Sequence, residues 1–305
     1  MSDDADIQVV SDSWAGIQRV AATPKPPEFF EGRQGYSAGF LGRDAHVTLP
    51  SIGEPISMDD IAKLKDGSFE LRYQHFSTVQ CMSRRMPLYS ACNIDGSKSK
   101  NVPRHDTWSY DGRIAKEHQM LREAYGPGQE GKFSRGHMTR RQDPNWGPLA
   151  TARKANIDTF FATNACPQWQ PFNEGLWGDL EDYVLGNAQG DDKRISVFTG
   201  PILRPDDPER FSIRIPRDFW KVVAFVSEAT GELAAIAYLM SQGRYLDSGV
   251  ARDLEDFGTS QRPLAFIEAE TGLGFESLAG RDVLDGADLA FAQPIRRFTD
   301  TKLPA

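Results

Sequence analysis

The sequence contains few cysteines, no long apolar run and no basic leader, and each absence excludes a class of protein. Its three cysteines, Cys81, Cys92 and Cys166, form no Cys-x-x-Cys pair, so we expect neither a disulfide framework nor a structural zinc site. There is no run of about eighteen apolar residues, so neither a membrane-spanning helix nor a membrane partner is expected. The composition, 39% hydrophobic and 26% charged, is otherwise that of a globular chain.

The N-terminal region is acidic where a secretory signal would be basic. The chain opens with Met-Ser-Asp-Asp-Ala-Asp, and no apolar segment of the signal-peptide type follows. We therefore expect a cytoplasmic protein or one delivered by an unconventional route. Residues 1–27 are predicted to form a tail or arm, with a short helix around residues 14–20. Residues 28–305 are predicted to form a single domain, because no Pro-, Gly- or Ser-rich linker divides them.

Positive charge is concentrated in the middle of an acidic chain. The net charge is -8, yet residues 81–154 contain 14 Lys and Arg against 7 Asp and Glu. The remainder contains 21 basic and 36 acidic residues. A basic region of this kind suits a surface that binds phosphate, and it equally suits a solvated face of ion pairs. Charge alone leaves both interpretations open.

Hydrophobic patterns predict an α+β fold with a central, mostly antiparallel sheet and flanking helices. Four apolar runs predict strands: 86–94, 195–201, 219–226 and 233–240. The last two, separated by a short turn, predict a hairpin. A short strand is expected at 160–164, a short capped helix at 57–65, and one helix with an apolar stripe at 173–185. Helices and strands do not alternate regularly, which favours α+β over a doubly wound fold.

His137 is the first candidate for chemistry. It follows Gly136 and stands between Arg135 and the pair Arg140-Arg141. Neighbouring arginines favour the neutral form of an imidazole, and a neutral imidazole is a competent general base. The same arginines could hold a phosphate and stabilise charge that develops on it. Considered alone, however, a histidine in a polar loop is more often a structural or surface residue.

Asn173 and Glu181 are the second candidates. They lie eight residues apart in the predicted helix, so their side chains would point to roughly the same side of it. An amide oxygen and a carboxylate are hard donors of the kind that Mg2+ prefers. The alternatives are an asparagine that caps the helix and a glutamate that is merely solvated.

Three motifs in this order carry a family resemblance. They are Ser134-Arg-Gly-His137, Asn164-x-x-Pro-Gln168 and Asn173-x-x-x-Trp177-x-x-Leu-Glu181. Together they resemble the sugar-non-specific DNA/RNA endonuclease family, which includes secreted bacterial nucleases and mitochondrial endonuclease G. Three outer motifs extend the resemblance over about residues 35–280: Thr199-Gly-Pro-Ile202, Ile215-Pro-x-x-Phe-Trp-Lys221 and Thr271-Gly-Leu273.

The resemblance implies a ββα-metal (His-Me finger) nuclease core and a metal-dependent endonuclease that acts on DNA and RNA. It implies that His137 is the general base and that Asn173 is the only direct protein ligand of one Mg2+, with Mn2+ as a substitute. Glu181 would hold a metal-bound water. Arg135 would contact the phosphate, and Asn164 would order the site beside the histidine.

The family also has an upstream arginine, for which Arg104 is the best match and Arg84 and Arg85 compete. One position departs from the family pattern, because Ser134 stands where an aspartate is usual. Members of the family are often homodimers, so a homodimer is one expectation, and an inhibitor or immunity partner is another.

Two other classes of function stay open beside the nuclease. A catalytically weak or inactive nucleic-acid-binding protein on the same scaffold would explain Ser134 and the negative net charge. A zinc enzyme is disfavoured, because the five histidines show no His-x-x-x-His spacing.

Overall fold

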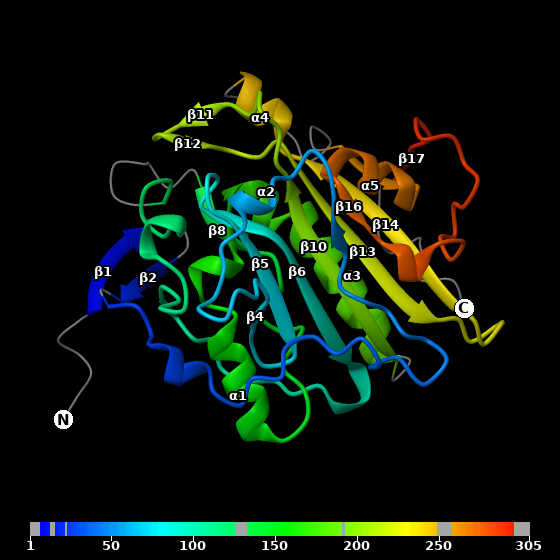
Figure 1. Ribbon diagram of the computed structural model, residues 1–305, viewed down its shortest axis with the longest axis horizontal. Coiled ribbons are helices and arrows are strands. Elements are labelled where there is room, and N and C mark those ends of the chain that lie inside the picture. Colours follow the sequence, from blue (N-terminus) through cyan, green and yellow to red (C-terminus); the bar gives the residue numbers. More distant parts are fainter. Residues whose placement is uncertain are drawn as a thin grey trace.

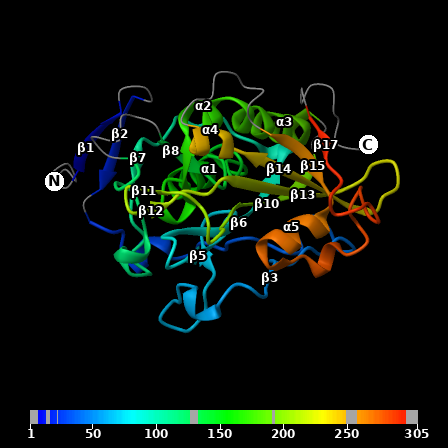
Figure 2. The same cartoon turned by 90° about the horizontal axis from the view of Figure 1, so that it is seen from above.

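Eight strands form a central antiparallel sheet (Figures 1 and 2). The computed structural model describes residues 7–12, 16–21, 23–125, 133–190, 193–248 and 258–295. The strands of this sheet are, in spatial order, β17 (Gln293–Pro294), β15 (Thr259–Arg262), β14 (Leu233–Ser241), β13 (Asp218–Val226), β10 (Arg194–Ile202), β6 (Met86–Asp95), β5 (Phe76–Cys81) and β4 (Leu71–Arg72). The predicted hairpin is confirmed as β13 paired with β14.

Both faces of the sheet are covered, which explains the nearly continuous apolar runs in its central strands. Figure 2 shows α3 (Leu176–Gly190) on one side of β10 and β13 and α5 (Leu264–Thr271) on the other. On β13, Phe219 and Val223 pack in the core cluster that includes α3. Trp220 on the same strand packs in the second cluster, with α5. The α+β class predicted from the sequence is therefore confirmed.

A two-stranded ribbon and a short helix lie on the α3 side of the sheet. The ribbon pairs β8 (Phe133–His137) with β9 (Ala165–Trp169) in antiparallel register. The long connection between them contains α1 (Leu149–Asp158) and the 3-10 turn η6 (Ala162–Asn164). Helix α2 (Gln170–Glu174) follows β9 directly and packs against both strands. The order strand, strand, helix is that of a ββα core.

The predicted single helix at 173–185 is wrong, because the chain breaks between α2 and α3. Gly175 ends α2 with φ -92° and ψ -114°, outside the helical region, a backbone conformation that glycine adopts at little cost. Asn173 and Glu181 therefore lie on different helices, and their relative position depends on tertiary packing.

Three shorter elements also differ from expectation. Residues 162–164 form η6 instead of a strand, and the predicted helix at 57–65 is reduced to the 3-10 turn η3 (Met58–Asp60), although Ser57 does cap it. Around residues 14–20 the described part is a strand, β2 (Gly16–Ala21), which pairs in parallel with β7 (Thr107–Trp108). Residues 13–15 lie outside the described residues. Local sequence did not reveal this long-range pairing.

The remaining described elements are short. They are β1 (Ile7–Asp12), β3 (Ser51–Ile52), β11 (Glu209–Arg210), β12 (Ile213–Arg214), β16 (Leu273–Gly274), α4 (Gly243–Ser248), η2 (Pro27–Phe30), η4 (Gly96–Lys98), η5 (Lys116–His118) and η8 (Glu276–Leu278). None of the helices in the described ranges is both long enough and apolar enough to cross a bilayer.

Candidate active site

His137 ends strand β8, and the glycine before it is required by close packing. A Cβ atom on Gly136 would lie 1.9 Å from Gln168 Oε1 and 2.3 Å from its Cδ atom. Gln168 is fully buried on β9, so it has little room to move away. The Gly-His pair thus allows the two strands of the ribbon to approach closely, and this packing fixes the backbone that carries the imidazole.

The imidazole of His137 is half-buried and packs against two aromatic rings. Its centroid lies 4.8 Å from that of Trp108 and 4.9 Å from that of Phe160. The Nε2 atom is buried and has no hydrogen-bond partner among the described residues. Burial, and then the positive charges of nearby arginines, hold the pKa of His137 well below its usual range. The ring is therefore neutral at physiological pH and has a nitrogen able to accept a proton.

Asn164 fixes the backbone that follows His137. Its Oδ1 accepts a hydrogen bond from the Thr139 amide at 2.8 Å, and its Nδ2 donates to the carbonyls of Thr139 and Thr159. Its own carbonyl accepts a bond from the Met138 amide. The side chain is completely buried. These bonds fix the turn after His137; the ordering role that the resemblance implies for Asn164 agrees with them and stays a prediction.

Three arginines bring positive charge to His137, namely Arg104, Arg140 and Arg141. Arg104 is exposed, forms a surface ion pair with Asp106 at 3.1 Å and lies over the Phe160 ring at 5.3 Å, next to the imidazole. Arg141 is half-buried, and its Nη1 donates to the Val102 carbonyl at 3.3 Å. Repulsion by Arg104 and Arg140 adds to burial in lowering the pKa of Arg141. A concentration of like charge beside a neutral base is suited to an anionic ligand.

Arg135 does not join these arginines in the structure. It is 3% exposed, and its Nε and Nη2 atoms donate to the Leu121 carbonyl at 3.0 and 2.7 Å. Its guanidinium also lies over the Tyr125 ring, 4.9 Å from the centroid. This geometry contradicts the expected phosphate contact, because the donors are used inside the fold. Arg135 instead anchors β8 to the segment around Leu121.

The other upstream arginines are engaged elsewhere. Arg84 forms a buried ion pair with Asp207, and Arg85 binds Glu123 and the Gln119 carbonyl. Neither is among the charges that affect His137. Among the three candidates for the upstream role, the structure brings only Arg104 to the imidazole.

Asn173 reaches the ribbon through helix α2. The helix begins at Gln170, whose side-chain oxygen accepts a hydrogen bond from Ser134 on β8. Asn173, half-buried, lies one turn further along the same helix. Ser134, at the position where the family usually has aspartate, thus ties the histidine strand to the asparagine helix by a neutral hydrogen bond.

Glu181 belongs to a buried group of charges behind the ribbon. Its Oε2 lies 3.7 Å from Arg140 Nε, and its Oε1 is buried without a hydrogen-bond partner among the described residues. Burial raises the pKa of Glu181 to about 7, against the lowering effects of Lys221 and Arg140. Asp143 is part of the same group, and burial raises its pKa to about 6.

Two members of this group, Lys221 and Asp143, received no role from the sequence. Lys221 carries a signal that could have revealed it, because a lysine inside the apolar run 219–226 must either be paired or have its charge put to use. Asp143 carries no such signal. It lies in a polar loop, and only the fold shows that it is buried.

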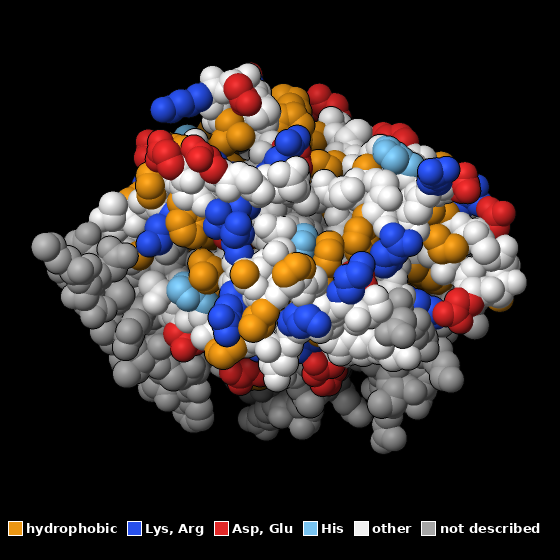
Figure 3. All heavy atoms as spheres, turned by 90° about the horizontal axis from the view of Figure 1, so that it is seen from below, with side chains coloured by type: hydrophobic (Ala, Val, Ile, Leu, Met, Phe, Trp, Pro, Cys, Tyr) orange, Lys and Arg blue, Asp and Glu red, His pale blue; other side chains and the backbone are white. Residues whose placement is uncertain are grey.

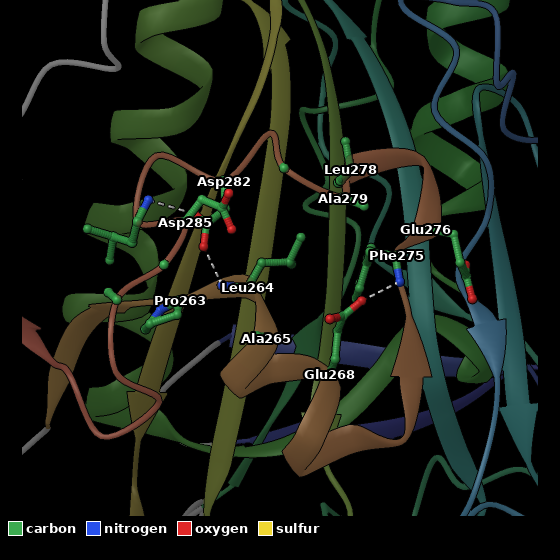
Figure 4. Close-up of a pocket in the computed structure, with 14 residues that line it drawn as sticks. Pro263, Leu264, Ala265, Glu268, Phe275, Glu276, Leu278, Ala279, Asp282 and Asp285 are labelled. Atoms are coloured by element: carbon green, nitrogen blue, oxygen red, sulfur yellow. Dashed lines mark hydrogen bonds between the residues drawn. The ribbon is translucent and has the colours of Figure 1, made fainter.

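A hollow on the opposite side of the sheet is separate from this chemistry. It has a volume of about 360 Å³ and lies between α5 and the loop that follows it (Figure 4). Two of its carboxylates brace the backbone: Asp282 accepts from the Leu264 and Leu284 amides, and Glu268 accepts from the Phe275 amide. Since these oxygens are already used, the hollow is not the candidate active site.

A histidine on a two-stranded ribbon beside an asparagine helix defines the ββα-metal class of nucleases. The chain belongs to the DNA/RNA non-specific endonuclease family, whose model matches residues 59–282. A solved structure described as the EndoG/EndoGI complex has the same fold. Its TM-score is 0.52 at 20% identity, and the match covers 69% of this chain and 86% of that one.

Two relatives are similar in sequence. The uncharacterized protein y4fB of Sinorhizobium fredii is 37% identical over 297 residues, 92% of this chain and 44% of that protein. A protein named nuclease from Nostoc is 27% identical over 149 residues, 48% of this chain and 51% of that protein. The chain thus spans about half the length of these curated relatives.

Proposed function

We propose that the protein is an endonuclease that hydrolyses phosphodiester bonds of DNA and RNA with little sequence specificity. The observation that carries this proposal is the neutral, desolvated His137, with an unpartnered Nε2 atom and three arginines nearby. A base of low pKa beside concentrated positive charge is suited to a reaction in which water attacks an anionic phosphate.

In this mechanism His137 accepts a proton from the water as the water oxygen forms a bond to phosphorus. The bond from phosphorus to the 3′-oxygen breaks, and that oxygen leaves as a hydroxyl once it has gained a proton. The products carry a 5′-phosphate and a 3′-hydroxyl. No step uses a 2′-hydroxyl, so both DNA and RNA serve as substrates.

Arg104 and Arg141 are the residues we assign to the phosphate oxygens. Both contribute to the positive field at the imidazole, whereas Arg135 faces the Leu121 carbonyl. Guanidinium groups bind phosphate oxygens with paired N–H donors and stabilise the charge that develops on them. Contacts to phosphate carry little sequence information, which agrees with a non-specific enzyme.

Two described residues carry oxygen donors of the kind that a divalent cation prefers. The buried Oε1 of Glu181 has no partner, and Asn173 supplies an amide oxygen on α2, so the donors are hard oxygens. Asn173 would bind Mg2+ or Mn2+ directly, and Glu181 would support it from behind. When bound, the cation would stabilise negative charge on the phosphate and on the leaving oxygen.

The surface charge supports a nucleic-acid substrate. Figure 3 shows a face with Lys and Arg side chains across its middle and acidic side chains mainly near its margins. In the basic segment 81–154, several such residues are exposed: Lys98, Lys100, Arg104, Arg153 and Lys154. A surface of this kind binds phosphates through release of counterions, so cleavage should weaken steeply with salt.

The test is cleavage of supercoiled plasmid and of RNA, with Mg2+, with Mn2+ and with EDTA. We expect wild type to cleave both substrates only with metal. His137→Ala should remove nearly all turnover while it keeps DNA binding, and His46→Ala, a change at an exposed histidine, should be fully active. Equal cleavage by wild type and His137→Ala would refute the proposal.

The second candidate function is nucleic-acid binding without catalysis, favoured by Ser134 in place of the usual aspartate. It predicts retention of DNA in a gel shift with no metal-dependent degradation. An inhibitor or immunity partner is a further proposal, supported by a structural neighbour that is itself described as an inhibited complex. A homodimer stays an expectation from the family resemblance.

A further inference from the structure

The described part of the N-terminal arm runs beside the segment that carries Trp108. Strand β2 pairs in parallel with β7, with Val20 opposite Trp108. Further along, the Lys25 amide donates to the Tyr110 carbonyl at 2.9 Å, and the Gly112 amide donates to the Lys25 carbonyl at 2.8 Å. In Figure 2, β1, β2, β7 and β8 lie at one end of the molecule. The arm is thus attached to the domain at two successive points, close to the ribbon.

On its other side, the segment that follows β7 pairs with the chain that leads into β9. The Ser109 amide donates to the Phe160 carbonyl at 2.9 Å, and the Ser109 carbonyl accepts from the Ala162 amide at 3.0 Å. Phe160 and Trp108 are the two rings that pack against the His137 imidazole. Three chain segments therefore lie side by side, namely the arm and the two segments that carry these rings.

Val20 joins the arm to the rings by side-chain packing as well. Its side chain is completely buried, in the small core cluster that contains Trp108 and Phe160. Ala165 belongs to the same cluster, and it lies opposite His137 in the ribbon. Close-packed side chains transmit displacement, because a void beside a ring removes its contacts on that side. The position of the imidazole therefore depends on a residue of the arm.

We propose that the N-terminal arm is a positioning segment of the nuclease site: through Val20 it fixes Trp108 and Phe160, the rings against which the His137 imidazole packs. The inference rests on the proposed function. It gives a role in the site to residues that precede the stretch 59–282 matched by the family model. Because the arm acts through the two rings, it should affect turnover and not the binding of DNA.

The test compares Val20→Ala with wild type in the full chain. The first readout is the NMR signal of the His137 ring without substrate, assigned among the five histidines by comparison with His137→Ala. Nearby aromatic rings shift this signal, so it should move when the rings move. The second readout is plasmid cleavage. We expect kcat to fall about 10-fold, since a misplacement of about 1 Å can cost about 10²-fold. KM should stay unchanged, because Val20 carries no group that binds phosphate.

Two further variants separate positioning from stability. Val222→Ala makes the same change at an equally buried site in the second core cluster, on the α5 side of the sheet. It should lower Tm but leave the His137 signal and kcat unchanged. Gly112→Ala places a Cβ atom 2.5 Å from the Lys25 carbonyl oxygen, so it displaces the arm while Val20 is intact. It should reproduce the effects of Val20→Ala, and it tests the inference even if that variant does not fold.

Contrary outcomes are specific. An unshifted His137 signal with wild-type kcat in both Val20→Ala and Gly112→Ala would overturn the inference, as would the same changes in Val222→Ala. Failure of the proposed function looks different, because wild type would then not cleave with any metal while the His137 signal would still move in Val20→Ala.

Discussion

The indole of Trp108 packs against the imidazole of His137, with ring centroids 4.8 Å apart. Trp108 is completely buried, in a small core cluster that also contains Val20 and Phe160. Strand β2 pairs beside it, with Val20 opposite Trp108. The protonation state of the candidate base is therefore governed by hydrophobic packing as much as by neighbouring charge.

Replacing this indole should shift the acid limb of the reaction. In Trp108→Leu, water reaches the imidazole, and loss of burial lets the pKa of His137 rise toward its usual 6.5. Each unit by which the pKa exceeds the pH lowers the neutral fraction about tenfold. Activity near pH 6 should therefore fall relative to activity near pH 8, more than in wild type.

The pH profile of kcat/KM checks this prediction. The matched control is Trp146→Leu, because the indole of Trp146 stacks on His75 instead. Identical profiles would contradict the role given to burial.

Removing Arg141 should impair cleavage without unfolding the protein. Loss of one donor to a developing oxyanion typically costs about 10²–10³-fold in rate. We expect the rate loss in Arg141→Ala to lie near the lower end of this range, because Arg104 remains. The slope of log affinity for DNA against log salt concentration should also become shallower, by an amount that corresponds to roughly one phosphate contact. Arg281→Ala, at an exposed ion pair with Glu232, is the control and should behave as wild type. A normal rate and salt slope in Arg141→Ala would remove this residue from the phosphate site.

A methyl group at position 136 should disable the ribbon. Gly136→Ala places Cβ within 2.6 Å of three Gln168 side-chain atoms, so β8 must shift or the glutamine must move. We expect a loss of activity and a lower Tm. Shortening the partner in Gly136→Ala/Gln168→Ala should restore part of both. If the double variant is no better than Gly136→Ala, side-chain crowding is not why glycine is needed there.

The ionised carboxylate of Glu181 should destabilise the metal-free protein at neutral pH. Its folded pKa, about 7, is raised above the usual 4.5. The stabilisation associated with the raised pKa is complete below about pH 4.5 and is lost as the pH rises through 7. In EDTA, Glu181→Gln should therefore melt higher than wild type at pH 8, which thermal unfolding followed by calorimetry measures. The gap should close near pH 4.5. A wild-type protein that melts higher at pH 8 would reverse the sign of this argument.

The sequence alone predicted those strands whose local hydrophobic pattern matches their burial in the fold. Continuous apolar runs predicted β10, β13 and β14, because strands covered on both faces need no polar alternation. The family resemblance of the motifs around His137, Asn164 and Asn173 predicted a ββα core. The structure places Arg104 near the imidazole, while the ordering role of Asn164 and the metal and phosphate roles stay predictions.

The failures have a common physical cause, which is that neighbours distant in the chain determined the outcome. Arg135 was expected at the phosphate, but Leu121 supplies a carbonyl and Tyr125 a ring that hold it inside. The membership of Lys221 and Asp143 in one buried group of charges is apparent only in the folded structure, in which α3 lies over the sheet.

The candidate base is carried by a two-stranded ribbon and not by the eight-stranded sheet. A pair of strands has far fewer hydrogen bonds and neighbours than β10, which is paired on both sides. The residues of the ribbon are nevertheless buried except at the end of each strand, and Phe133 and Cys166 belong to the core cluster that includes α3. The position of the base therefore depends on side chains of the same core that joins α3 to the sheet, so substitutions that disturb this packing should alter activity and stability together.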